Sequence, residues 1–167
     1  MASFDVLNRL HYLQQEHPAL GLYGLLDGAQ YLEQTGKRFS PNQCAIALFS
    51  ETVDAPLAFA GPWLIDAGAA DNELIEELVG FECKSYGVSW LIAHQDMQAL
   101  AQILRLRLET ELPDGRRALL RFWDPRILAS LVKIFTPEQR REFFGYIFEW
   151  HLLLDREKRV RIGSRDV

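Results

Sequence analysis

The chain has 167 residues, of which 49% are hydrophobic and 25% charged, and its formal net charge is −5. This size and balance are typical of one folded globular domain, exclude a disordered or fibrous chain and, with a pI near 5.4, argue against general nucleic-acid binding. The charge is uneven, because residues 1–104 carry 4 Lys+Arg and 13 Asp+Glu whereas residues 105–167 carry 14 and 10.

The N-terminal part of the chain predicts one helix and one buried strand. Apolar residues recur at three-residue spacing over about residues 4–16, which favours an amphipathic helix. Residues 22–26 are continuously apolar and predict a strand that ends in a turn at Asp27 and Gly28. Residues 43–49 form a second apolar run whose state the periodicity leaves open.

The middle of the chain predicts two strands and a helix between them. Residues 63–65 follow a Gly-Pro pair and read as a strand. Asp71 or Asn72 is expected to cap a helix that runs to about residue 79. Residues 88–93 (VSWLIA) are continuously apolar, which predicts a strand buried on both faces of a sheet.

Helix N-caps organise the second half. Asp96 is expected to cap a helix to about residue 108, and Asp124 followed by proline predicts a helix over residues 125–134. Thr136 begins a capping box for a further helix that ends near Gly145. Strands alternating with helices therefore predict an α/β fold with a mixed β-sheet flanked by helices.

The remaining segments of the second half are a turn, a strand and a tail. Residues 113–115 (Pro-Asp-Gly) predict a turn, and residues 118–123 predict a strand. Residues 146–154 are aromatic-rich and ambiguous between helix and strand, whereas the basic tail at 156–167 is expected to fray. We expect a single domain over residues 1–167 with its core at about 20–150.

Familiar catalytic, targeting and membrane-spanning patterns do not occur in the sequence. It contains no phosphate-binding loop, nucleophile elbow or paired-histidine metal motif, and no apolar run of the ~18 residues that a membrane span needs. The first residues lack the basic and apolar regions of a secretory signal, and Cys44 and Cys83 form no CxxC pair. We therefore expect a cytoplasmic protein that is not an enzyme and has no metal, no cofactor and no membrane contact.

The densest polar group lies around Arg121, Asp124 and Arg126. On a strand, Arg121 would need an edge position or a carboxylate partner, and Asp27 is a candidate partner. Two readings stay open. Asp27 and Asp124 could serve a small hydrolase beside Arg121, or the group could be a structural ion-pair network that also caps a helix.

Aromatic residues crowd positions 143–150, more than one helix face can bury. Phe144, Phe148 and Trp150 are therefore candidate contacts for a protein partner, since aromatic residues dominate the energetics of interfaces. The alternative is that all of them belong to the core.

Four segments follow one another along the chain: LYGLLDGAQ at 22–30, AGPWLI at 60–65, the strand and helix that begin at Ser85, and PDGRRALLRFWDPRIL at 113–128. Together they resemble the adaptor and effector-chaperone proteins of the bacterial type VI secretion system, which are built around a domain of unknown function. The last segment is the most specific of the four.

The resemblance implies a non-enzymatic protein of the bacterial cytoplasm that binds a toxic effector and helps load it onto the VgrG spike. An immunity-type protein that binds and blocks a toxin is the other binding alternative. Under the resemblance, six residues are expected to hold the fold or to contact the cargo: Asp27, Trp63, Arg121, Trp123, Asp124 and Arg126. The basic C-terminal third is the first place to look for a partner, with the acidic part as the opposite pole or the spike-facing side.

Overall fold

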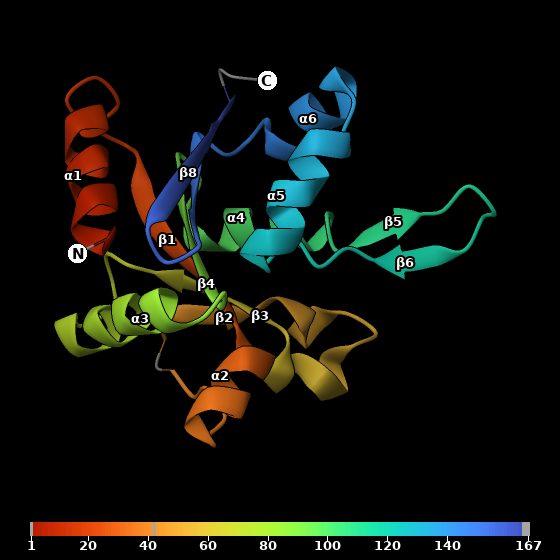
Figure 1. Cartoon of the computed structure of the whole chain (residues 1–167), viewed down its shortest axis with the longest axis horizontal. Coiled ribbons are helices and arrows are strands. Elements are labelled where there is room, and N and C mark those ends of the chain that lie inside the picture. The colour runs from red at the N-terminus through yellow and green to blue at the C-terminus, as the bar shows by residue number, and fades with distance from the viewer. Residues whose placement is uncertain (1, 42, 165–167) are drawn as a thin grey trace.

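A central antiparallel sheet carries helices on both of its faces in a computed structural model that describes residues 2–41 and 43–164 (Figure 1). The sheet has six strands in the order β2-β3-β1-β4-β7-β8. Their bounds are β1 Gly21–Asp27, β2 Ala45–Ala47, β3 Pro62–Asp66, β4 Val88–Ala93, β7 Glu149–Leu154 and β8 Lys158–Gly163.

The helices begin where side chains can cap them. Four of the expected N-caps accept a hydrogen bond from the first turn of their helix: Asp71, Asp96, Asp124 and Thr136. The α-helices are α1 Ala2–Gln14, α2 Gly28–Thr35, α3 Asn72–Lys84, α4 Met97–Arg105, α5 Pro125–Ile134 and α6 Pro137–Phe144. Two short 3₁₀ helices, η1 Leu48–Glu51 and η2 Ala55–Ala60, connect β2 to β3.

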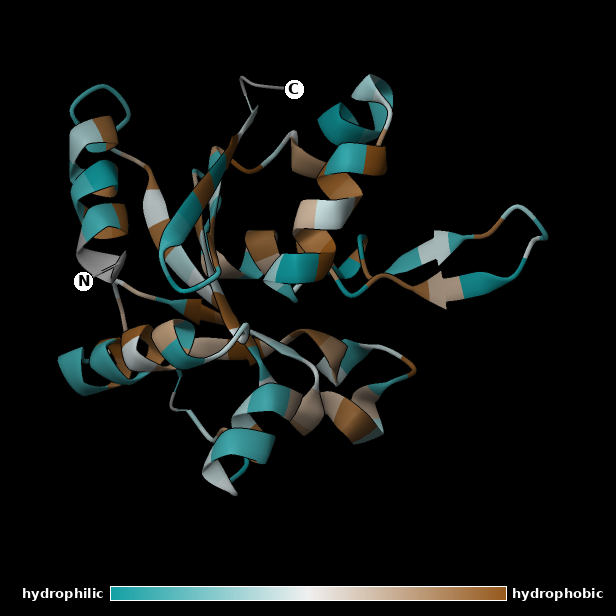
Figure 2. Ribbon diagram, viewed as in Figure 1, coloured by the Kyte–Doolittle hydropathy of each residue, from teal (hydrophilic) through white to brown (hydrophobic). Residues whose placement is uncertain are grey.

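The sheet separates two hydrophobic cores. Along β4, Trp90 and Ile92 join the core under α1 and α3, whereas Leu91 and Ala93 join the core under α4, α5 and α6. This alternation follows from the two-residue period of a strand, and it explains why β4 is apolar throughout. Figure 2 shows the same arrangement as hydrophobic colour on the central strands and on the side of α1 that faces the sheet.

The structure confirms the α/β class with a helix-flanked sheet and corrects its strand directions. Every strand pair in the described residues is antiparallel, so the sheet is not a mixture of parallel and antiparallel pairs. A helix between two strands can return the chain in either direction, and for that reason the alternation of elements did not determine the direction of the strands.

Three local expectations were wrong. The turn expected at Asp27 and Gly28 is instead the start of α2, with Asp27 as its N-cap. The strand expected over 118–123 is only three residues long, β6 Arg117–Leu119, because the following residues turn toward α5, with the Asp124 N–H donating to the Arg121 carbonyl. The tail expected to fray pairs along β7 as β8, from Lys158 to Gly163, and positions 165–167 lie outside the described residues.

A small hairpin extends away from the rest of the molecule (Figure 1). It pairs β5 Glu109–Glu111 with β6, and its turn contains Gly115 at φ 82°, as the Pro-Asp-Gly turn predicted. The ambiguous aromatic segment becomes a strand, β7, in the second half of the sheet.

Candidate functional site

Asp27 is the buried acceptor at the centre of a polar cluster. It is the last residue of β1 and the N-cap of α2, and its side chain is fully buried. Its Oδ1 accepts the main-chain N–H groups of Ala29 and Gln30 at 3.0 and 3.2 Å, and its Oδ2 accepts the Gln30 amide at 3.0 Å. Asp27 thereby satisfies two of the four N–H groups that a helix N-terminus leaves unpaired.

Arg121 comes to Asp27 from the segment between β6 and α5. Its Nη2 lies 3.6 Å from Asp27 Oδ2, so the pairing predicted from the sequence is confirmed. The Arg121 side chain is half-exposed, and its guanidinium lies 5.9 Å from the ring of Trp123. The Arg121 side chain therefore remains in contact with solvent while its Nη2 lies beside a buried carboxylate.

Asp124 and Arg126 form a second pair at the start of α5. Asp124 accepts the main-chain N–H of Arg126 at 2.9 Å and its Nε and Nη2 at 3.1 and 2.8 Å. The hydrogen bond to Asp124 raises the pKa of Arg126 despite a smaller opposing effect of burial, and the nearby Asp27 carboxylate adds to the rise. The Arg126 guanidinium also lies over the Tyr86 ring, 4.6 Å from its centroid.

The loop before β4 closes the cluster. The Gln30 amide donates to the Tyr86 carbonyl at 3.0 Å, and the Asp27 N–H donates to the Gly87 carbonyl at 2.8 Å. We call the group Asp27, Gln30, Tyr86, Arg121, Asp124 and Arg126 the Asp27 corner. It joins the segments LYGLLDGAQ and PDGRRALLRFWDPRIL, which are separated in the chain by residues 31–112.

Gly28 allows the backbone to pack closely beside this corner. A Cβ at Gly28 would lie 2.3 Å from the Phe59 carbonyl and 3.0 Å from the Trp63 indole nitrogen. The Trp63 N–H itself donates to the Phe59 carbonyl at 3.3 Å. Trp63 is therefore a half-buried residue that packs beside the Asp27 corner, whereas Asp27 lies at its centre.

The remaining aromatic candidates belong mainly to the core. Trp123 is buried and packs edge-to-face on Phe49. Phe144 at the end of α6 and Trp150 of β7 are buried as well, in the core under α5 and α6, so neither side chain lies at the surface as expected of an interface contact. Phe148 is half-buried and packs against the rings of His17 and His94, with centroids 5.1 and 5.6 Å apart.

The chemistry of the Asp27 corner is that of a satisfied network. Each oxygen of Asp27 and of Asp124 has at least one hydrogen-bond or ion-pair partner, and both carboxylates are nearly inaccessible to solvent. A general base or nucleophile needs an oxygen that can reach a substrate, and this arrangement favours the structural reading over the hydrolase reading. Among the described residues, no group of three His, Cys, Asp or Glu side chains is placed to hold a metal ion.

A second polar network, which the sequence did not suggest, attaches α1 to the sheet. Arg9 of α1 donates to Glu149 of β7 at 2.6 Å, and His151 Nε2 lies 2.9 Å from the same carboxylate. Burial alone would raise the pKa of Glu149, but the hydrogen bonds from Arg9 and His151 outweigh it and lower that pKa. Burial lowers the pKa of His151, partly offset by Glu149.

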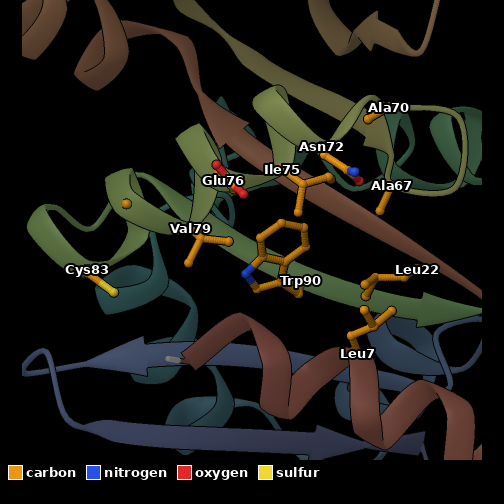
Figure 3. Close-up of a pocket in the computed structure, with 11 residues that line it drawn as sticks. Leu7, Leu22, Ala67, Ala70, Asn72, Ile75, Glu76, Val79, Cys83 and Trp90 are labelled. Carbon is orange, nitrogen blue, oxygen red and sulfur yellow. The ribbon is translucent and has the colours of Figure 1, made fainter.

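A groove between α1 and α3 is a concave feature that sequence reasoning missed. Its volume is about 630 Å³, and Figure 3 shows the Trp90 indole between the two helices. The signals that point to it are Leu7, which is 38% exposed on the apolar side of α1, and a glycine inside α3, Gly80. In the part of the chain that the structure describes, no helix is long and apolar enough to cross a membrane.

Comparison with known proteins identifies one family. Residues 22–142 match the domain of unknown function DUF4123, a family associated with effector loading in type VI secretion. Comparisons with curated proteins and with solved structures give no match. The matched range contains every residue of the Asp27 corner and covers most of the sequence, and the chain therefore belongs to the DUF4123 family.

Proposed function

We propose that this protein is a non-enzymatic adaptor that binds a type VI secretion effector in the bacterial cytoplasm and helps load it onto the VgrG spike. The observation that carries the proposal is the family match over residues 22–142, which spans both segments of the Asp27 corner. Each oxygen of the Asp27 and Asp124 carboxylates already has a hydrogen-bond partner within the protein, and this supports a binding role over a hydrolytic one.

The test is reconstitution with candidate toxins and VgrG spike proteins from the genome that encodes this chain. The three proteins are co-expressed, and complexes are sized by chromatography with light scattering. We expect a stable complex of this chain with the toxin, and recovery of toxin on the spike only when this chain is present. A toxin that stays soluble and joins the spike equally well without this chain would contradict the proposal.

A protection assay separates the adaptor from an immunity protein. The chain is produced in a susceptible target cell that is then exposed to the toxin. An adaptor leaves the target cell sensitive, whereas an immunity protein protects it.

A further inference from the structure

The groove between α1 and α3 is a mostly apolar hollow lined by residues of both helices and of the sheet. Its floor is the Trp90 indole of β4 and Leu22 of β1, and its walls include Leu7 of α1 and Ile75 and Val79 of α3 (Figure 3). A volume of about 630 Å³ lies within the range of ligand pockets, and it is large enough for bulky apolar side chains of a partner.

The floor of this groove offers a hydrogen-bond donor that nothing in the described chain uses. Trp90 is 1% exposed, and its indole N–H has no acceptor among the described residues. The indoles of Trp63 and Trp150, in contrast, donate to the Phe59 carbonyl and the Ser89 hydroxyl. Because a buried donor without an acceptor is unfavourable, an incoming oxygen atom at this point would be bound selectively.

The charge along the groove indicates the chemistry of the partner. α3 and its N-cap present four exposed carboxylates that form no ion pair within residues 2–41 and 43–164. Three of them, Asp71, Glu73 and Glu77, line a separate hollow beside Tyr31, whose hydroxyl donates to Glu77 at 2.6 Å. The fourth is Glu76. Glu76 lines the groove itself. A partner with Lys or Arg beside its apolar side chains would complement this edge.

We propose that the groove between α1 and α3 binds an apolar segment of the effector that is flanked by Lys or Arg. A main-chain carbonyl oxygen of that segment accepts the Trp90 N–H, and this oxygen is not hydrogen-bonded within the segment itself. This inference rests on the proposed adaptor function and adds to it the contact face and the class of segment. The acidic part of the chain, rather than the basic C-terminal third, then holds the cargo.

Gly80 gives a way to fill the groove without disturbing the fold. It lies within α3 and lines the groove, and a Cβ added there meets no atom within 4 Å. Gly80→Phe places a ring in the groove, and Gly80→Ala is the matched control that keeps the groove open. Both substitutions replace a poor helix former, so we expect the midpoint temperature of thermal denaturation of each variant to be at least that of the wild type.

The affinity for the purified toxin identified in the reconstitution above is measured by isothermal titration calorimetry. We expect Gly80→Phe to weaken binding at least about tenfold and Gly80→Ala to leave it within about twofold. Trp90→Phe removes the N–H donor together with part of the buried indole ring, and we expect about three- to tenfold weaker binding. Glu76→Lys should weaken binding and reduce its salt dependence, whereas Glu157→Lys, an exposed charge reversal between β7 and β8, should not.

Two results overturn the inference while leaving the adaptor function intact. One is toxin binding by Gly80→Phe with wild-type affinity. The other is self-association of the wild type that Gly80→Phe abolishes, since the occupant would then be a second copy of this chain.

A synthetic peptide of Leu and Lys residues separates failure of this inference from failure of the adaptor function. If the wild type binds no toxin, the adaptor function fails. The claim that the groove binds an apolar, basic segment is then supported only if the peptide binds the wild type and Gly80→Ala but not Gly80→Phe. Equal binding of a peptide with Glu in place of Lys contradicts the charge argument.

Discussion

The Asp27 corner and the groove between α1 and α3 lie at different places in the same fold and differ in how their polar groups are satisfied. In the corner, each carboxylate oxygen of Asp27 has a partner, although the residue is fully buried. In the groove, the Trp90 N–H is buried without an acceptor in the described chain, and the lining carboxylate of Glu76 forms no ion pair there.

This difference assigns separate roles to two features that the sequence alone could not rank. A buried polar group whose hydrogen bonds are complete contributes to stability and leaves little for a partner to gain. A buried donor without an acceptor in the described chain, in contrast, can gain a hydrogen bond when a partner supplies an oxygen atom. Changes in the corner should therefore act on folding, and changes in the groove should act on binding.

The largest effect is expected from Asp27→Ala. It removes the acceptor of two α2 main-chain N–H groups and of the Gln30 amide and leaves Arg121 without its carboxylate. We expect the free energy of unfolding to fall by about 3 kcal/mol in urea denaturation followed by circular dichroism. Glu109→Ala, which removes the exposed ion pair with Arg117 in the hairpin, is the control and should change it by less than about 0.5 kcal/mol. A loss below about 1 kcal/mol for Asp27→Ala would contradict a structural corner.

The same substitution should have opposite signs in the two regions. Gly28→Ala forces a Cβ to within 2.3 Å of the Phe59 carbonyl, and we expect a loss of about 2 kcal/mol in the free energy of unfolding. Gly80→Ala meets no neighbour and should gain up to about 1 kcal/mol through helix propensity. Chemical denaturation of both variants side by side measures the contrast, and a loss in both would mean that the groove is already packed in solution.

Substitution of Asp124 separates capping from ion pairing. Asp124→Asn keeps an oxygen for the Arg126 main-chain N–H but removes the charge facing its half-exposed guanidinium, so we expect a loss below about 1 kcal/mol. Asp124→Ala removes both contacts and should cost about 1.5 kcal/mol. The free energies of unfolding of the two variants decide the question. Equal losses would show that the charge, rather than the cap, stabilises α5.

Acid should weaken the attachment of α1, which forms one wall of the groove. Because burial lowers the pKa of His151 below its ordinary 6.5, the unfolded chain binds the proton first as the pH falls. The free energy of unfolding should then decline below pH 6.5 by at most about 1.4 kcal/mol per pH unit. Below pH 4.5 it should fall again as Glu149, whose pKa is lowered, becomes protonated in the unfolded chain first.

His151→Gln isolates the first of these two steps. Urea denaturation from pH 7.5 to 5 is compared between the variant and the wild type, with hydrogen exchange of α1 as the local readout. The variant should lose less stability over this range than the wild type. Parallel curves for the two proteins would mean that His151 does not contribute to the decline.

Local signals in the sequence predicted much of the secondary structure. The capping residues Asp96 and Thr136 located the starts of α4 and α6, and the apolar run at 88–93 matched β4 along its whole length. These features succeed because capping and strand burial depend on neighbouring residues and on a simple period. Asp27-Gly28 misled the same reasoning, since an aspartate followed by glycine is typical of a turn and also starts a helix.

The pairing of Arg121 with Asp27 was also within reach of the sequence. A cation next to buried aromatic residues needs a carboxylate, and Asp27 was a candidate at the end of a buried strand. Phe144 and Trp150, expected at the surface, are buried instead, because aromatic density does not show which side of a helix or a strand faces the core. For Trp150, the strand must also be placed in the sheet. That placement depends on the register of β7 against β4, which joins segments far apart in the chain.

The sequence by itself determined the fold class, the helix starts and a family resemblance, because each depends on residue order over short distances. Only the tertiary structure decided the antiparallel order of the strands, the pairing of β8 and the completeness of the Asp27 corner. It also decided that Trp90 is buried without an acceptor in the described chain. Whether a polar group is satisfied depends on atoms brought together from distant segments, and local patterns carry no record of that.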